Sequence, residues 1–211
     1  MPLPHCPLCK SPSKSFYDKP LREYFQCLTC KGIFLHPSLF PDAKSEKKRY
    51  LEHNNDTEDK GYRNFVSPIT KAVLQHFEKD HQGLDFGAGT APVISKMLDE
   101  RGYQIVQYDP YFHPYPQLLD KKYNYIVCCE VIEHFHFPEK SFLLLKNLLL
   151  PGGKLFCMTD IYNKTIDFNS WYYKNDQTHV FIFQEETLSF IRDSIAFSQM
   201  SINGRLITYT L

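Results

Sequence analysis

Strand-like and helix-like segments alternate along the middle of this chain. Short apolar segments typical of buried strands occur at 83–86, 104–108, 125–129 and 154–159. Stretches with helical periodicity separate them at 92–101 and 139–149. This alternation is the pattern of βαβ units, so the sequence predicts an α/β fold built on a parallel sheet.

Further elements flank these units. Ser67 and Pro68 match the N-cap and first position of a helix that continues as an apolar stripe. Near the C-terminus, a helix predicted over 185–192 is followed by strand-like pieces at 195–201 and 205–210. Asn203-Gly204 between these pieces favours a two-residue hairpin turn. We therefore expect the sheet to end in an antiparallel pair.

Four of the seven cysteines form two CxxC pairs near the N-terminus. The members of these pairs are Cys6, Cys9, Cys27 and Cys30. In a reducing compartment, this spacing indicates metal ligation rather than disulfides, and four thiolates suit tetrahedral Zn²⁺. We predict a zinc ribbon over residues 1–40. His5 and His36 flank the pairs, but four thiolates already complete the coordination.

Two roles are open for such a ribbon: binding a nucleic acid or partner, or replacing a core that the segment is too small to build. Residues 1–40 carry five Lys or Arg against two acidic residues. One Zn²⁺ with four thiolates subtracts two more charges and leaves about +1, a poor phosphate-binding surface. We therefore favour the structural role.

The overall composition excludes several classes of protein. A hydrophobic fraction of 43% suits a globular core, and 24 basic residues balance 24 acidic ones, which argues against nucleic acid as a partner. No apolar run reaches the roughly 18 residues of a membrane span. The N-terminus lacks the apolar region of a secretory signal, so we expect a cytoplasmic protein without a membrane partner.

A glycine-rich loop follows the first predicted strand of the alternating region, with the sequence LDFGAGTAP at 84–92. Its glycines permit a tight turn with a ligand against bare backbone. Asp85 can meet a cationic amino group but would repel a pyrophosphate. The third glycine of a dinucleotide fingerprint is missing because Pro92 takes its place. The loop is therefore typical of a ligand without phosphates.

A second carboxylate, Asp109, directly follows the next strand and precedes Pro110. In doubly wound folds an acid at this position accepts hydrogen bonds from ribose hydroxyls. An isolated Asp-Pro pair is often only a surface turn. Its pairing with Asp85 favours the ligand-binding interpretation.

Together these motifs resemble class I S-adenosylmethionine (SAM)-dependent methyltransferases, in particular those with an N-terminal four-cysteine zinc ribbon. The matching pieces are LDFGAGTAPV at 84–93, YDP at 108–110, CEVIEHF at 129–135, LLLPGGKL at 148–155 and DQTHVFIF at 176–183. The resemblance implies a Rossmann-like, seven-stranded methyltransferase sheet. One departure is that residues 111–122 are too short for the usual third strand and helix, which leaves Leu118 and Leu119 as candidates for the adenine contact.

The resemblance also implies which residues bind SAM. The glycine loop would hold its methionine part, and Asp109 its ribose. Apart from the resemblance, the position of Tyr62 in the polar segment 42–65 suggests that it closes over the cofactor as part of a lid. The expected cofactor-binding residues are Tyr62, Asp85, Phe86, Gly87, Ala88, Gly89, Asp109, Pro110 and Glu130.

The string E-x-x-E-H at 130–134 follows another strand, at the sheet edge where α/β ligands bind. In one interpretation Glu130 lines the cofactor pocket and Glu133-His134 caps a short turn. In the other, Glu130, Glu133, His134 and His179 hold Mg²⁺ or Mn²⁺, which would lower the pKa of a substrate hydroxyl. The second resembles small-RNA 2′-O-methyltransferases and some quinone-precursor O-methyltransferases. It makes Glu133, His134 and His179 the catalytic residues.

These observations predict a SAM-dependent methyltransferase that transfers a methyl group to an O or C atom of a small molecule. The expected organisation is a zinc ribbon at 1–40, a helical connector or lid at 41–80 and the methyltransferase domain at 81–211. Aromatic residues at 111–115 and 171–173 would shape the acceptor pocket. The alternatives are an RNA methyltransferase that grips RNA with its ribbon, and a non-catalytic zinc-ribbon module on a degenerate Rossmann domain.

Overall fold

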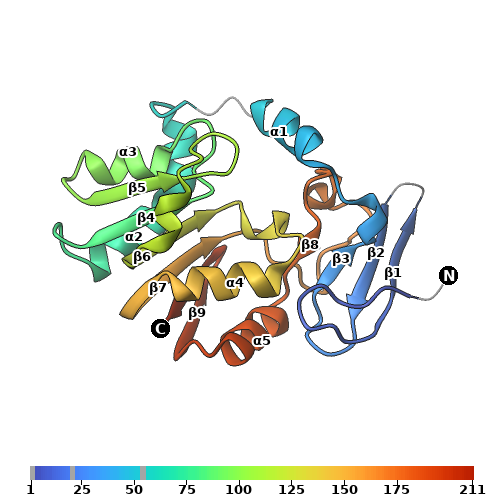
Figure 1. Cartoon of the computed structure of the whole chain (residues 1–211). Helices are drawn as coiled ribbons and strands as arrows, with labels where there is room; N and C mark the ends of the chain where they lie inside the picture. Colours follow the sequence, from blue (N-terminus) through green and yellow to red (C-terminus); the bar gives the residue numbers. More distant parts are fainter. Residues whose placement is uncertain (1–2, 20–21, 53–55) are drawn as a thin grey trace.

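A six-stranded sheet forms the centre of the computed structural model, which describes residues 3–19, 22–52 and 56–211 (Figure 1). Its strand order is β5-β4-β6-β7-β10-β9. The strands are β4 (Gln82–Phe86), β5 (Gln104–Tyr108), β6 (Tyr123–Cys129), β7 (Leu149–Met158), β9 (Gln199–Asn203) and β10 (Leu206–Thr210). The first four strands in this order pair in parallel, and β10 pairs antiparallel with β7 and β9. The predicted α/β fold with an antiparallel end is confirmed.

The prediction of seven strands is wrong, because the sheet has six. The missing strand would follow β5, where the chain instead forms the 3₁₀ helix η2 (Pro116–Asp120) and passes directly into β6. This short segment has no room for a strand and its crossover helix. β5 is consequently the edge strand of the sheet.

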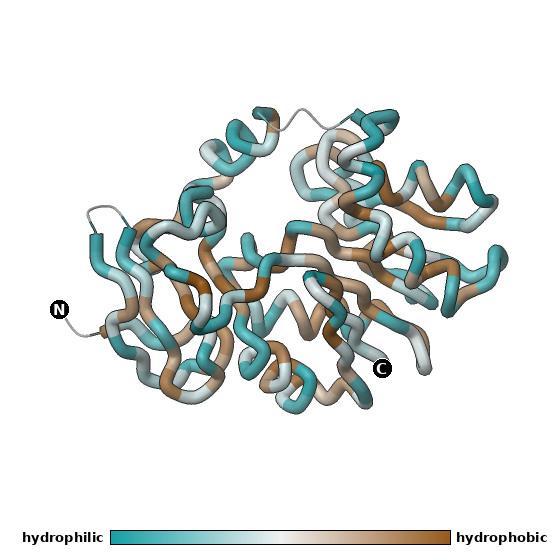
Figure 2. The backbone as a smooth tube through the Cα atoms, turned by 180° about the vertical axis from the view of Figure 1, so that it is seen from behind, coloured by the Kyte–Doolittle hydropathy of each residue, from teal (hydrophilic) through white to brown (hydrophobic). Residues whose placement is uncertain are grey.

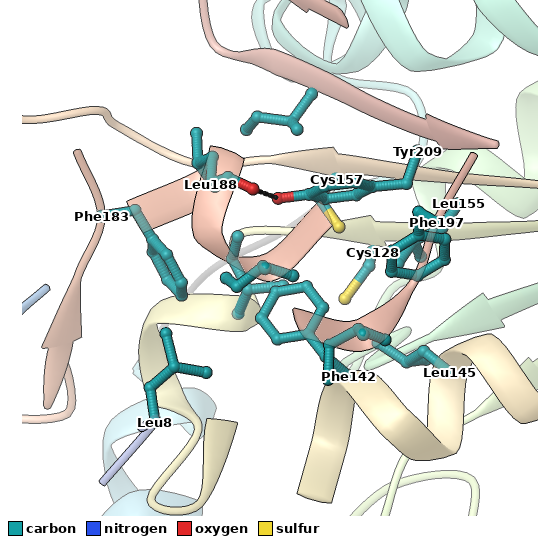
Figure 3. Packing of buried hydrophobic residues seen from close by; sticks show 14 of the residues in the cluster. Leu8, Cys128, Phe142, Leu145, Leu155, Cys157, Phe183, Leu188, Phe197 and Tyr209 are labelled. Carbon is teal, nitrogen blue, oxygen red and sulfur yellow. Dashed lines mark hydrogen bonds between the residues drawn. The ribbon is translucent and has the colours of Figure 1, made fainter. Parts of the chain in front are cut away.

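Helices cover both faces of the sheet (Figure 1). They are α2 (Lys60–His76) and α3 (Val93–Asp99) on one face, and α4 (Pro138–Asn147) and α5 (Glu185–Ile195) on the other. Successive residues of β6 point to opposite faces: Val127 packs in the cluster with α2 and α3, whereas Ile126 and Cys128 pack with α4 and α5. Figure 3 shows the second cluster, and Figure 2 the apolar strands between more polar helices. No helix in the described part of the chain is long and apolar enough to cross a membrane.

Helix α2 begins earlier than the sequence predicted. Asp59 is its N-cap and accepts a hydrogen bond from the backbone N–H of Tyr62, so the expected cap at Ser67 is wrong. Pro68 lies inside the helix. The buried stripe of Val66 and Ile69 spans the proline, and its packing outweighs the missing backbone hydrogen bond.

A second sheet contains most of the N-terminal segment, with the order β1-β2-β3-β8. Its strands are β1 (Ser13–Lys19), β2 (Arg22–Cys27), β3 (Ile33–Leu35) and β8 (Phe181–Ile182), all paired antiparallel. The last of these strands belongs to the C-terminal half of the chain. Helix α1 (Ala43–Leu51) leads from this sheet toward α2, and lies across the top of the molecule in Figure 1.

The interior proline of α2 yields a stability prediction. Pro68 is exposed, so Pro68→Ala removes no buried side chain and restores a backbone N–H to the helix. We expect the free energy of unfolding to rise by about 1–2 kcal/mol, less than the full helix penalty because the unfolded chain gains freedom. Urea unfolding followed by circular dichroism measures the change. An equal or lower stability of Pro68→Ala would show that the proline does not strain α2.

Candidate active site

A cavity of about 720 Å³ lies at the carboxyl ends of β4, β5 and β6. Helices α1 and α2 and the segment 172–179 close its other sides, and its size is typical of a small-molecule site. Its lining residues include Glu46, Arg49, Tyr50, Tyr62, Phe65, Phe86, Gly87, Ala88, Gly89, Tyr108, Asp109, Pro110, Tyr111, Phe112, Cys129, Glu130, His134, Phe135, Tyr172, Tyr173, Asn175, Asp176 and His179. Eight of the nine residues expected at the cofactor line this cavity, and Asp85 is the exception.

The glycine loop forms one wall. Gly87 has φ +79°, and a Cβ there would lie 2.5 Å from Val131 Cγ2, so both backbone angle and packing require glycine. Gly89 has φ +64°, and a Cβ there would meet no atom within 4 Å. The space in front of Gly89 is therefore open for a ligand that contacts bare backbone, which fits the expected cofactor.

Asp109 and the glycine loop are bonded to each other. Asp109 Oδ2 accepts a hydrogen bond from Gly89 N–H at 3.0 Å, and Oδ1 accepts from Tyr111 and Phe112 N–H. A carboxylate has about four acceptor positions, so Asp109 keeps acceptor capacity toward the cavity that it lines. This arrangement agrees with the predicted contact to hydroxyl groups and also holds the loop in place.

Asp85 lies beneath the loop and is only 4% exposed. Its Oδ2 accepts a hydrogen bond from Ser95 Oγ at 2.7 Å, and burial raises its pKa to about 6. Asp85 does not line the cavity, and the contact to a ligand's amino group that the sequence suggested stays a prediction. Leu118 and Leu119, the candidates for the adenine contact, do not line the cavity either.

Glu130 points to Arg205 rather than to the other acidic residue of its motif. Arg205 Nη2 lies 2.8 Å from both carboxylate oxygens of Glu130, which has a left-handed φ of +51°. Burial and the charge of Glu133 raise the pKa of Glu130, and the guanidinium of Arg205 opposes that shift. Glu130 lies outside the metal-like cluster described next, so the expected four-residue set is reduced to three.

Glu133, His134 and His179 converge at one end of the cavity, with potential ligand atoms all within 4.8 Å of one another. Glu133 is fully buried, and burial raises its pKa to about 7. Tyr173 donates its hydroxyl to Oε1 and Thr159 donates to Oε2 at 3.1 Å. These hydroxyls fix the carboxylate, an arrangement typical of the partners behind a metal ligand.

Both imidazoles in this cluster have a defined tautomer. His134 Nδ1 lies 2.8 Å from Thr178 O, and His179 Nδ1 lies 2.8 Å from Tyr173 O. A carbonyl oxygen only accepts, so each Nδ1 carries the proton. Burial lowers the pKa of His179 to about 3 and also lowers that of His134, so both rings are neutral. Each ring therefore has a free lone pair on Nε2.

Helix α1 covers the cavity through polar contacts that the sequence did not predict. Glu46 is buried and accepts hydrogen bonds from Tyr111 Oη at 2.6 Å and from His136 Nε2 at 2.9 Å. Arg49 donates to Asp176 Oδ2 through Nε and Nη2, at 3.0 and 2.8 Å. The helix is thus tied to loops on both sides of the cavity. For these contacts, the sequence offered one indication: Asp176 lies in the segment 176–183, which is one of the pieces that match the methyltransferases.

The expected aromatic walls are present in part. Tyr111 and Phe112 line the cavity from one side, and Tyr172 and Tyr173 from the other. Trp171 is instead buried in a cluster behind the cavity. The aromatic residues therefore divide between the ligand space and its support.

The four N-terminal cysteines form a second cluster with metal-like geometry. Their sulfur atoms all lie within 4.8 Å of one another, with 3.6 Å between Cys6 and Cys30 and 3.3 Å between Cys9 and Cys27. Sulfur atoms bound to one Zn²⁺ lie about 3.8 Å apart, given a Zn–S distance of about 2.3 Å. The N–H groups of Thr29 and Cys30 point at Cys27 Sγ. The donor set therefore fits Zn²⁺.

Comparison with known proteins places this fold and site in a family. Residues 44–191 match a family model described as a methyltransferase domain, and the chain belongs to that family. The match covers nearly all of α1, the glycine loop and the cluster of Glu133, His134 and His179. No curated protein matches the chain.

Solved structures share the fold at low sequence identity. A Burkholderia thailandensis 1,6-didemethyltoxoflavin N1-methyltransferase, solved with its substrate and S-adenosylhomocysteine (SAH), has a TM-score of 0.59 and 13% identity over 93% of this chain and 98% of its own. A Nostoc punctiforme protein provisionally described as an O-methyltransferase has a TM-score of 0.55 and 11% identity over 71% of this chain. This chain spans only 56% of that protein. A SAM-dependent methyltransferase from Archaeoglobus fulgidus has a TM-score of 0.50 and 18% identity over 66% of this chain and 71% of its own.

The cysteine cluster yields a test of zinc binding. We expect about one zinc per chain in the native protein and none in Cys27→Ser, because three thiolates hold Zn²⁺ less tightly than four. Cys157→Ser is the matched control, since Cys157 is equally buried but lies outside the cluster. Mass spectrometry of metal content measures both. Equal zinc in native protein and Cys27→Ser would contradict a four-thiolate site.

Proposed function

We propose that this protein transfers a methyl group from SAM to a hydroxyl group of a small molecule. The observation behind this proposal is one continuous cavity that joins the glycine loop to the cluster of Glu133, His134 and His179. The loop end suits a nucleoside-containing cofactor, and the cluster end suits the activation of an oxygen nucleophile. Membership in a methyltransferase-domain family supports the reaction class.

The cofactor half is assigned from backbone and carboxylate positions. Gly87 and Gly89 leave room for a ligand against the main chain, and Asp109 retains acceptor positions for hydroxyl groups. The aromatic rings of Tyr62 and Phe65 stack 5.8 Å apart and line the same space. When bound, SAM supplies an electrophilic methyl group. The protein's task is to align the acceptor oxygen with that methyl and to keep water out.

We propose that Glu133, His134 and His179 hold a divalent cation at the acceptor end. The two Nε2 lone pairs and one carboxylate form a donor set that suits transition metals such as Mn²⁺ as well as Mg²⁺. Each imidazole is oriented by a backbone carbonyl and the carboxylate by two hydroxyls, as is usual for metal ligands. A bound cation would lower the pKa of an acceptor hydroxyl.

The size and chemistry of the cavity support a small-molecule acceptor. Its walls combine aromatic rings with few charged groups, and Arg49 is already paired with Asp176. The formal net charge of zero offers no general attraction for RNA. The structural neighbour from Burkholderia thailandensis binds a small molecule together with SAH, which supports the same class for this chain.

The cofactor assignment predicts a selective effect of a methyl group at Gly89. Gly89→Ala places a Cβ in the open cavity. Gly152 lies near the start of β7, away from the carboxyl ends of the strands, and has a similar φ of +75° with equally open space, so Gly152→Ala is the matched control. Both substitutions cost about 1–2 kcal/mol of backbone strain. We expect native protein and Gly152→Ala to bind SAM and SAH, and Gly89→Ala to lose at least tenfold in affinity.

Isothermal titration calorimetry measures these affinities, with NAD as the control ligand. NAD should not bind, because the loop lacks the dinucleotide fingerprint. Equal SAH binding by Gly89→Ala and Gly152→Ala would place the cofactor elsewhere. NAD binding in place of SAH would remove the proposed reaction.

The cation assignment predicts a loss of metal affinity in His179→Gln. In the presence of SAH we expect the native protein to bind one Mn²⁺ that His179→Gln binds at least tenfold more weakly, because one of three ligands is removed. His76→Gln is the control, since His76 is exposed and lies outside the cluster. Electron paramagnetic resonance of free Mn²⁺ gives the affinities. If all three proteins bind Mn²⁺ alike, His179 is not a ligand and the cation assignment is wrong.

A further inference from the structure

The four-cysteine segment is joined to the acceptor half of the cavity by a shared sheet. β3 pairs antiparallel with β8, with Phe34 opposite Phe181, and Leu35 N–H donates to Val180 O at 2.9 Å. Gly32 is required for this approach, since a Cβ there would lie 2.4 Å from Phe181 Cζ. β8 begins two residues after His179, so the edge of the small sheet ends beside the acceptor-end cluster.

Two side chains of β2 bind the backbone of the segment that precedes β8. Tyr24 is 1% exposed, and its hydroxyl lies 3.2 Å from His179 O and 3.4 Å from Lys174 O. Arg22 donates to Lys174 O and, at 2.6 Å, to Asn175 O. The main chain on both sides of the 174–179 loop is therefore fixed from the N-terminal sheet.

These contacts act on the imidazole of His179 through the backbone that carries it. The Nδ1–H of His179 donates to Tyr173 O, and the two rings lie 4.1 Å apart. Tyr173 in turn donates its hydroxyl to Glu133. Tyr24 also packs in the same buried cluster as Trp171 and Tyr173. Moving the loop backbone would therefore displace His179 Nε2 and release the carboxylate partner together.

The cofactor half is independent of these contacts. The glycine loop is bonded to Tyr108 O, at the end of β5, and to Asp109, which directly follows that strand. Within residues 3–19 and 22–36, no side-chain hydrogen bond reaches residues 86–90. The hydrogen bonds of Tyr24 and Arg22 thus support the acceptor half of the cavity and not the glycine loop.

We infer that Tyr24 is a positioning residue for His179, and that the four-cysteine sheet is a structural part of the acceptor half of the cavity. The role of His179 in methyl transfer rests on the proposed function, but its placement by Tyr24 does not. Loss of this contact should therefore disturb the acceptor half and leave SAH binding intact. A ribbon that served only to bind a partner would show no such selectivity.

The test compares Tyr24→Phe with Tyr209→Phe. Both variants keep the ring and remove one buried hydroxyl that binds a carbonyl. The Tyr209 hydroxyl donates to Leu188 O at 3.1 Å (Figure 3), and neither residue lines the cavity. The readouts are the ¹⁵N NMR signals of the His179 ring, assigned by their loss in His179→Gln, and SAH affinity by calorimetry. Thermal melts confirm that each variant is folded.

In Tyr24→Phe we expect the Nδ1–H of His179 to exchange with solvent about tenfold faster and its ring signals to shift, because the loop opens more often. SAH affinity should stay within twofold of native. Tyr209→Phe should leave both readouts unchanged. Arg22→Ala, which removes the contacts to Lys174 and Asn175, should reproduce the change if Tyr24→Phe does not fold.

Two results would overturn the inference. The first is unchanged His179 signals in folded Tyr24→Phe, or in Arg22→Ala if Tyr24→Phe does not fold. This result would show that the N-terminal sheet does not position the His179 ring. The same change in Tyr209→Phe would show general loosening rather than positioning. A native protein that fails to bind SAH would refute the proposed function alone, because the comparison of His179 signals is still decisive without a cofactor.

Discussion

The parallel pairing of β4 with β5 and β6 is the constraint on which the rest of the site depends. Their register sets Phe86 opposite Tyr108 and Asp85 opposite Val127, so all three strands end at one edge of the sheet. The chain must turn sharply there, and the left-handed Gly87 makes that turn where no Cβ would fit. Asp109 follows the adjacent strand and can therefore bond to the same loop. The cavity is the space that these strand ends leave open.

Compensation of buried charge determines which groups face a ligand in that space. An unpaired carboxylate is costly in a partly dry cavity, so Glu130 pairs with Arg205 and Asp176 with Arg49. Arg49 holds the pKa of Asp176 well below its usual range against the opposing effect of burial. Within the described residues Glu133 forms no ion pair with Lys or Arg, and two hydroxyls donate to its carboxylate instead. Among the described residues, no hydrogen bond is recorded for the Nε2 atoms of His134 and His179, so these lone pairs face a ligand at this end of the cavity.

Local sequence predicted what local geometry determines. The strand and helix alternation, the glycine loop and the CxxC pairs each depend on neighbouring residues, and the structure contains all three. The sequence also showed that 111–122 was too short for a strand and helix. The prediction of seven strands nevertheless followed the family resemblance, and it was wrong. Pro68 led to a wrong prediction of where α2 begins, because a helix tolerates an interior proline when a buried apolar stripe continues on both sides of it. The partner of Glu130 could not be predicted, since Arg205 lies 75 positions away and only the folded sheet brings them together.

The two halves of the cavity therefore differ in how the chain encodes them. The cofactor half comes from consecutive strand ends in one sheet, so a short motif is enough to predict it. The acceptor half is assembled from α1, from the motif after β6 and from the 172–179 loop, which is supported by β2 and β3. Each of these parts is remote in sequence from the others, and its position depends on tertiary contacts. The same central sheet can therefore persist while the outer segments change, which agrees with a fold shared with the structural neighbours at 11–18% identity.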